Sequence, residues 1–409
     1  MMPGNSKEFP MLTLTDMREL IGRTQTGKMS VEDLMAAEQT ALPGVGTCSM
    51  LGTANTMSCL AEVLGMSIPG CGLAHAVSAK KRRIAKQSGY RVVEMLKEGL
   101  TPRKIMTREA LRNGIIVSMA MGASTNSTLH IPAIAHEAGI DVSLKDFDEL
   151  SRKVPYLCNI KPSGAHPLLD LEISGGIPAV MKAVEPLLDG DAMTCTGKTV
   201  KENLKDVPLV ENDVLFSLEH PKREEGGLAI LSGSLAPDGA VVKQAGVKPG
   251  MQHFEGHARV FNSMEDACHA VSGGEIRQGD VLVIRYEGPK GGPGMREMHI
   301  VTSLIVGRGM DEMCALVTDG RFSGSSRGPC IGHVSPEAAA GGPIAIVEDG
   351  DPILIDIPSR RLELQIPQEE IDRRFKEWKP LRKNRTPALN RYASLVTSAD
   401  QGAILKTPQ

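Results

Sequence analysis

The chain has 409 residues, more than one compact core usually takes, which predicts two domains. Apolar residues make up 41% and charged residues 23%, a balance that excludes a long disordered tract and a coiled coil. The 46 basic and 49 acidic residues leave a net charge of -3, and aromatics are only 3%, so neither charge nor base stacking favours a nucleic-acid partner.

The eight cysteines are scattered along the chain, and its first ten residues are polar. No basic segment followed by an apolar run opens the chain, and the longest apolar runs are well short of the roughly 20 residues that span a bilayer. We therefore predict no membrane segment and a reduced, cytoplasmic setting.

The first half is dominated by helix signals. Ser30 precedes a periodic run to Ala41, Thr107 precedes another to Met119, and Ser143 precedes a third over residues 144–153; hydroxyl side chains cap helix starts. Between these runs lie short apolar stretches and the segments 53–64, 126–138 and 176–184. The mixture predicts an α/β layer domain over residues 1–225.

From about residue 226 the pattern changes to short β-rich runs separated by glycine and aspartate turns. The expected strands are residues 228–231, 240–243, 281–286, 314–318, 344–347, 353–357 and 361–365. They predict a β-barrel-like domain over residues 226–368, with the boundary in the charged stretch 219–225. Residues 369–409 are basic and rich in proline, typical of a solvated helix and tail.

Cys48 lies in a glycine turn directly before a predicted helix, in GTCSMLGTANTM. Backbone N–H groups and the positive helix end stabilise a thiolate there. Cys48 is therefore an iron–sulfur ligand, a nucleophile or an inert buried residue. Cys59 is eleven positions further on and forms no C-x-x-C pair with it.

Two later loops collect polar side chains. Glu287 and Glu297 flank a glycine-rich loop, where a carboxylate suits magnesium and where a charged barrel rim is the plainer alternative. The segment TDGRFSGSSRG then places Arg321 among hydroxyls and glycines after an apolar run, which resembles an anion cradle. His333 follows, either as a base or as a structural side chain.

Taken together, these segments resemble the dihydroxy-acid/6-phosphogluconate dehydratase family. The most specific ones are GTCSMLGTANTM, GASTNSTLHIPAIAHEAG, KPSGAHPLLDLEISGGIPAVMK, GGLAILSGSLAPDGAVVK, RYEGPKGGPGMREM, TDGRFSGSSRGPCIGHVSPEA and GGPIAIVEDGD. The resemblance implies an α/β domain that carries an iron–sulfur cluster and magnesium, followed by a β-barrel domain that closes over the site. It also implies a homodimer.

Carried over residue by residue, the resemblance makes Cys48 the last of three cluster cysteines and Glu297 a magnesium ligand. Ser323 matches the serine whose alkoxide takes the α-proton, and Ser325 the adjacent hydroxyl that holds substrate. We assign Arg321 to substrate binding with it. The implied cluster is of the two-iron or the four-iron type.

The implied reaction dehydrates a 2,3-dihydroxy acid to a 2-oxo acid. We expect the substrate to be 2,3-dihydroxy-3-methylbutanoate, a small-molecule intermediate of valine and isoleucine synthesis, with an aldonate or 6-phosphogluconate as the alternative. Only 45 residues precede the cluster motif GTCSMLGTANTM, and they hold no cysteine. We therefore expect an incomplete first domain, which leaves an inactive fragment or non-catalytic partner subunit as a second alternative.

Overall fold

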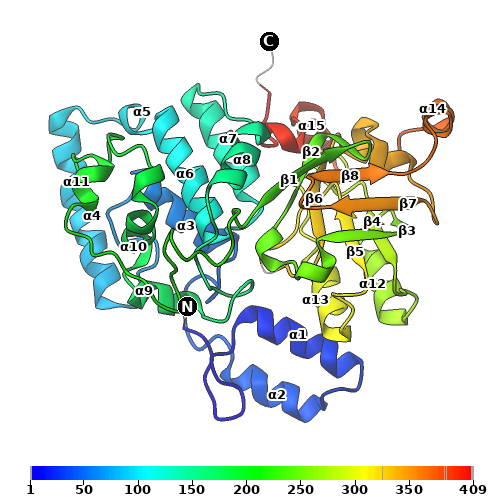
Figure 1. The fold of residues 1–409 in the computed structure, drawn as a ribbon, viewed down its shortest axis with the longest axis horizontal. Coiled ribbons are helices and arrows are strands. Elements are labelled where there is room, and N and C mark those ends of the chain that lie inside the picture. The colour runs from blue at the N-terminus through cyan, green and yellow to red at the C-terminus, as the bar shows by residue number, and fades with distance from the viewer. Residues whose placement is uncertain (1, 325, 382, 384, 407–409) are drawn as a thin grey trace.

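The computed structural model describes residues 2–324, 326–381, 383 and 385–406. Helices occupy one side of the molecule and a β-barrel the other, and the hairpin of α1 and α2 lies beneath both (Figure 1). No helix among the described residues has the length and apolar character needed to cross a membrane.

Eleven α-helices precede the first strand among the described residues, and their caps follow the sequence. Ser30 accepts the N–H of Asp33 and Thr107 that of Ala110, while Ser143 forms a capping box with Asp146; all three expected helix starts are confirmed. The helices are α1 (Leu14–Gln25), α2 (Val31–Thr40), α3 (Thr53–Val63), α4 (Ala79–Glu98), α5 (Pro102–Ile105), α6 (Arg108–Met121), α7 (Ser127–Ala138), α8 (Leu144–Lys153), α9 (Leu168–Ile173), α10 (Gly176–Ala183) and α11 (Val200–Leu204).

The α/β character expected of residues 1–225 is wrong for the described part, which holds isolated bridges and no strand. The segments at 53–64, 126–138 and 176–184 form α3, α7 and α10, and the short apolar stretches between the helices form no strand. A short apolar run that is buried on several sides has the same pattern in a helix and in a strand, so periodicity could not separate them. The mixture of helix and strand holds for the whole chain, with the strands confined to the second half.

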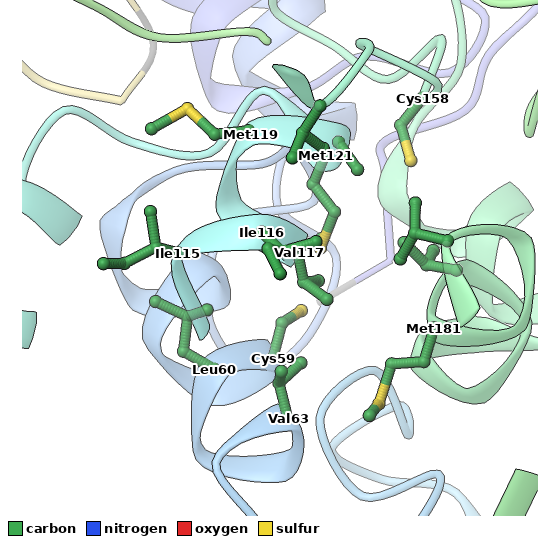
Figure 2. Close-up of a cluster of buried hydrophobic side chains, with 14 of the residues drawn as sticks. Cys59, Leu60, Val63, Ile115, Ile116, Val117, Met119, Met121, Cys158 and Met181 are labelled. Carbon is green, nitrogen blue, oxygen red and sulfur yellow. The ribbon is translucent and has the colours of Figure 1, made fainter. Parts of the chain in front are cut away.

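The helical side has a continuous apolar core, part of which is drawn in Figure 2. Cys59 of α3 and Met121 of α6 point into it together with Cys158. Both thiols are fully buried, and burial raises their pKa, so neither is available as a thiolate near neutral pH.

Eight strands close into a barrel in the order β1-β2-β6-β5-β4-β3-β7-β8. Six of the seven expected strands are confirmed, whereas residues 344–347 lie in a 3-10 turn, η5 (Pro343–Ile346), whose first proline lacks the N–H that a ladder needs. The strands are β1 (Ala229–Gly233), β2 (Ala236–Val242), β3 (His253–Phe261), β4 (Asp280–Ile284), β5 (Ala315–Thr318), β6 (Cys330–Ser335), β7 (Pro352–Asp356) and β8 (Arg361–Leu364).

Helices α12 (Met264–Gly273) and α13 (His299–Arg308) belong to the connections within the parallel run β3, β4, β5 and β6. Helix α1 packs on α13 so closely that a Cβ on Gly22 would lie 2.5 Å from the Cα of Gly307. Helices α14 (Gln368–Glu377) and α15 (Pro387–Leu395) follow the last strand. The division of the chain into domains at residues 225 and 368 stays a prediction.

The parallel pairing decides where the polar loops lie. Strand β4 pairs in parallel with β5, so their carboxyl ends meet at one rim of the barrel. The loop at residues 285–298 follows β4, and the loop at residues 319–329 follows β5. Segments that are separate in the sequence are therefore neighbours at this rim.

Candidate active site

The Cys48 loop is tied to the first turn of α3. The amide nitrogen Nδ2 of Asn55 donates to the carbonyl oxygen of Met50 at 2.7 Å and also to that of Cys48. A cavity of about 190 Å³ opens beside the loop. Its polar lining residues include Cys48, Ser49, Asn55, Ser58, His75 and Lys81. The half-buried Cys48 residue thus lines a cavity of mixed polar and apolar character beside the start of a helix.

The start of α3 also contacts the loop that carries Ser323. Gly52 is the N-cap of α3 and has no side-chain cap. A Cβ built on Gly324 would lie 2.7 Å from the Cα of Gly52 and 3.1 Å from the backbone nitrogen of Thr53. The two loops therefore meet backbone against backbone, which requires glycine at position 324.

Asn126 joins the polar loops at one point. Its Nδ2 donates to Thr53 Oγ1 at 2.7 Å and to Glu297 Oε1 at 3.0 Å, and it lies 3.5 Å from the carbonyl oxygen of Phe322. Asn126 is fully buried and directly precedes α7. One amide group thus connects the start of α3, the start of α7 and both rim loops.

Glu297 and Arg321 lie side by side because their backbones form a parallel bridge between the two rim loops. The guanidinium nitrogen Nη1 of Arg321 is 3.5 Å from Glu297 Oε1, and each side chain is about one quarter exposed, at 28% and 27%. Ser323 is half-buried two residues after Arg321. Ser325 lies outside the described residues.

A buried carboxylate holds the two rim loops together. Asp319 accepts the N–H groups of Tyr286 at 3.0 Å, Glu287 at 2.9 Å and Ala338 at 2.9 Å. Glu337 in turn accepts the N–H of Gly291 at 2.8 Å. Burial and then the Asp319 charge raise the pKa of Glu337 to about 7. These hydrogen bonds hold together the two rim loops that carry Glu297 and Ser323.

His333 is buried in β6, and its Nδ1 lies 3.3 Å from Thr128 Oγ1. Burial, followed by the charges of Arg321 and His130, lowers the pKa of His333 to about 3. The imidazole is therefore neutral near pH 7. Its backbone φ of 57° is unusual for a residue other than glycine.

Comparison with known proteins places this geometry in a family. The model for the N-terminal domain of dihydroxy-acid/6-phosphogluconate dehydratases matches residues 1–203, and the model for the C-terminal domain matches residues 213–403. The chain belongs to the dihydroxy-acid/6-phosphogluconate dehydratase family. The two-domain organisation of this family accounts for the helical part and the barrel.

Relatives named dihydroxy-acid dehydratase align with nearly the whole chain. The protein from Methanothermobacter thermautotrophicus is 52% identical over 99% of this chain and 74% of its own length. The Ignicoccus hospitalis protein is 54% identical over 92% of this chain and 68% of its own length. The expectation of an incomplete first domain stays a prediction.

The cofactors that the family implies need more ligands than the described residues bring together. No group of three His, Cys, Asp or Glu side chains in the described part of the chain could hold a metal ion. Cys48 is the one thiol that lines its cavity in this part, whereas iron–sulfur clusters take several thiolates. Glu297 is paired with the cation of Arg321, which opposes binding of a second cation. Taken alone, these residues do not fit a cluster or a magnesium ion.

Sequence reasoning found Glu297, Arg321 and Ser323, which the structure brings to one rim, and Cys48, whose loop reaches the same place through Gly52. It did not single out Thr53 or Asn126, although both lie within quoted motifs. Polar side chains inside GTANTM and GASTNST were a signal, because the first residues of a helix offer free N–H groups to a site. Sequence reasoning did not single out Lys243 either.

Proposed function

We propose that the protein is a hydro-lyase that converts 2,3-dihydroxy-3-methylbutanoate to 3-methyl-2-oxobutanoate. The reaction removes the proton at C2 and the hydroxyl group at C3 as water. The resulting enol then becomes the 2-oxo acid. The contact that supports this assignment best is the Asn126 amide, because it gathers Glu297, Thr53 and the loop of Ser323 at one rim.

Within this proposal Ser323 takes the proton from C2 and Arg321 holds the substrate carboxylate. The guanidinium of Arg321 is half-buried, and its Nε donates to the carbonyl oxygen of Met295. That bond sets the plane of the group, and planar guanidinium groups recognise carboxylates in two-pronged fashion. Ser325 keeps its proposed role in holding substrate, although it lies outside the described residues.

We retain an iron–sulfur cluster and magnesium as the proposed cofactors. Cys48 is the proposed cluster ligand and Glu297 the proposed magnesium ligand of this chain, and further ligands are left unassigned. The cavity beside the Cys48 thiol supports the first assignment. For Glu297 the support is a carboxylate oxygen at the rim where Ser323 lies, since hard oxygen ligands suit magnesium.

A substrate comparison tests the proposal. The purified protein, reconstituted without oxygen with iron, sulfide and magnesium, is assayed for 2-oxo acid formation. We expect turnover of 2,3-dihydroxy-3-methylbutanoate to exceed that of gluconate, xylonate and arabinonate. The matched control Ser323→Ala should lose about 100-fold or more of kcat. A preference for an aldonate would replace the substrate, and no turnover of any acid would favour the non-catalytic alternative.

Two further proposals concern the setting and the assembly. All eight cysteines are free thiols, which supports a reducing, cytoplasmic compartment. The homodimer is proposed from the family resemblance. Light scattering coupled to size-exclusion chromatography tests it by giving the molar mass of the protein in solution. A mass near that of one chain would contradict the dimer.

A further inference from the structure

Lys243 is a buried lysine whose amine lies beside the loop of Ser323. It follows β2 directly, and its side chain is only 5% exposed. Its Nζ donates to the carbonyl oxygen of Gly324 at 3.2 Å. No carboxylate forms an ion pair with it among the described residues. Burial lowers the pKa of Lys243 to about 7.

A buried amine without a carboxylate partner is costly, because water no longer solvates it and no opposite charge replaces the water. An apolar side chain of the same length would avoid that cost. The amine therefore needs a role that an apolar side chain could not fill. Costly buried polar groups of this kind concentrate at functional sites.

Among the described residues, a second hydrogen bond joins the segment after β2 to the loop that Lys243 contacts. Gly328 donates its N–H to the carbonyl oxygen of Gly246 at 3.1 Å. The stretch after β2 thus holds the loop at residues 324–328 at both ends. Gly324 also packs closely against Gly52 at the start of α3. Ser323 is directly attached to the end that Lys243 holds.

We propose that Lys243 is a positioning residue for Ser323: its buried amine holds the Gly324 carbonyl and so keeps the Ser323 loop against the start of α3. Its importance for turnover rests on the proposed role of Ser323 as the base. The hold on the loop itself depends only on the hydrogen bond between Nζ and the Gly324 carbonyl oxygen.

The test compares Lys243→Met, which keeps an unbranched chain and removes the donor, with Lys243→Gln, which keeps a neutral donor. Lys222→Met is the matched control, because Lys222 is half-buried and donates to Asn159, and no hydrogen bond joins it to residues 320–329 in the described part of the chain. Amide hydrogen exchange of residues 320–329 and the separate kcat and KM values are measured for all four proteins.

We expect Lys243→Met to fold and to exchange amides in residues 320–329 about tenfold faster than the unchanged protein. Its kcat should fall about tenfold or more, with KM changed less than threefold. Lys243→Gln should recover part of both losses, and Lys222→Met should show neither. A Lys243→Met protein that matches the unchanged protein in exchange or in kcat would overturn the proposal.

Two outcomes separate this proposal from the proposed function. If the unchanged protein dehydrates no acid, the proposed function fails, and exchange at residues 320–329 still decides whether Lys243 holds the loop. If Lys243→Met does not fold, the exchange of Lys243→Gln decides instead. If the amides of residues 320–329 exchange faster in Lys243→Gln than in Lys222→Met, the result supports a role of Lys243 in holding the loop. Equal exchange rates in the two variants would reject that role.

Discussion

Replacing Gly324 by alanine should separate the Ser323 loop from α3. The added Cβ would lie 2.7 Å from the Cα of Gly52, 3.0 Å from its carbonyl carbon and 3.1 Å from the nitrogen of Thr53. All three atoms belong to backbone. No side chain can turn away to make room, so one of the two loops must move.

The size of the effect follows from these distances. Non-bonded carbon atoms settle at about 3.5–4.0 Å, so the loops must part by about 1 Å. Forcing extra volume into a packed contact costs about 1–3 kcal/mol of folding free energy. A shift of about 1 Å in a catalytic group costs about 100-fold in rate. We expect losses of these sizes from Gly324→Ala.

Gly52→Ala is the matched control. Its Cβ would meet only the Met50 side chain, with Cε at 3.2 Å and Sδ at 3.3 Å, and methionine adapts easily. Urea unfolding and kcat are measured for both variants. Gly324→Ala should be the less stable and the slower of the two. If it matches Gly52→Ala in both quantities, the close approach of the two loops is refuted.

Three further predictions concern neighbouring groups. Burial and the charge of Asp319 raise the pKa of Glu337 to about 7 from an ordinary 4.5, so the stability that its protonation adds is lost as the pH rises through 7. Between pH 5 and pH 8 the free energy of unfolding in urea should fall by up to about 3 kcal/mol more for the unchanged protein than for Glu337→Gln, and an equal fall in both proteins would contradict this. Cys48→Ser should lower bound iron and visible absorption after anaerobic reconstitution, while Cys71→Ser, which is outside the cavity lining, should not; equal iron in both variants would argue against Cys48 as a ligand. Asn126→Ala should lower kcat about tenfold, since Glu297 Oε1 loses its amide donor, and an unchanged kcat would show that this bond is dispensable.

The errors in the expected fold have a common cause. Strands β3 (His253–Phe261) and β6 (Cys330–Ser335) were both missed. Strand β3 is largely half-exposed and contains a glycine, and it gains its hydrogen bonds from β4 and β7. The strand expected at residues 344–347 is apolar and nevertheless forms η5. The local hydrophobic pattern predicts which segments are buried. Hydrogen bonding to strands that are distant in the sequence decides which of those segments become β-strands.

The sequence by itself determined the local features. Ser30, Thr107 and Ser143 cap their helices because a side-chain oxygen reaches an N–H only two or three residues away. The sequence motifs also selected Cys48 and Ser323 as candidate site residues, since those residue types carry the chemistry.

Only the tertiary structure decided which polar groups meet. Asn126 is 73 residues from Thr53 and 171 from Glu297 along the chain, and no spacing rule connects them. Lys243 resembles any lysine at the end of a strand until the barrel closes around it and removes water from its amine. Burial and long-range contacts arise from the packing of the whole chain. The tertiary structure is therefore needed to find the buried polar groups that contact the candidate site.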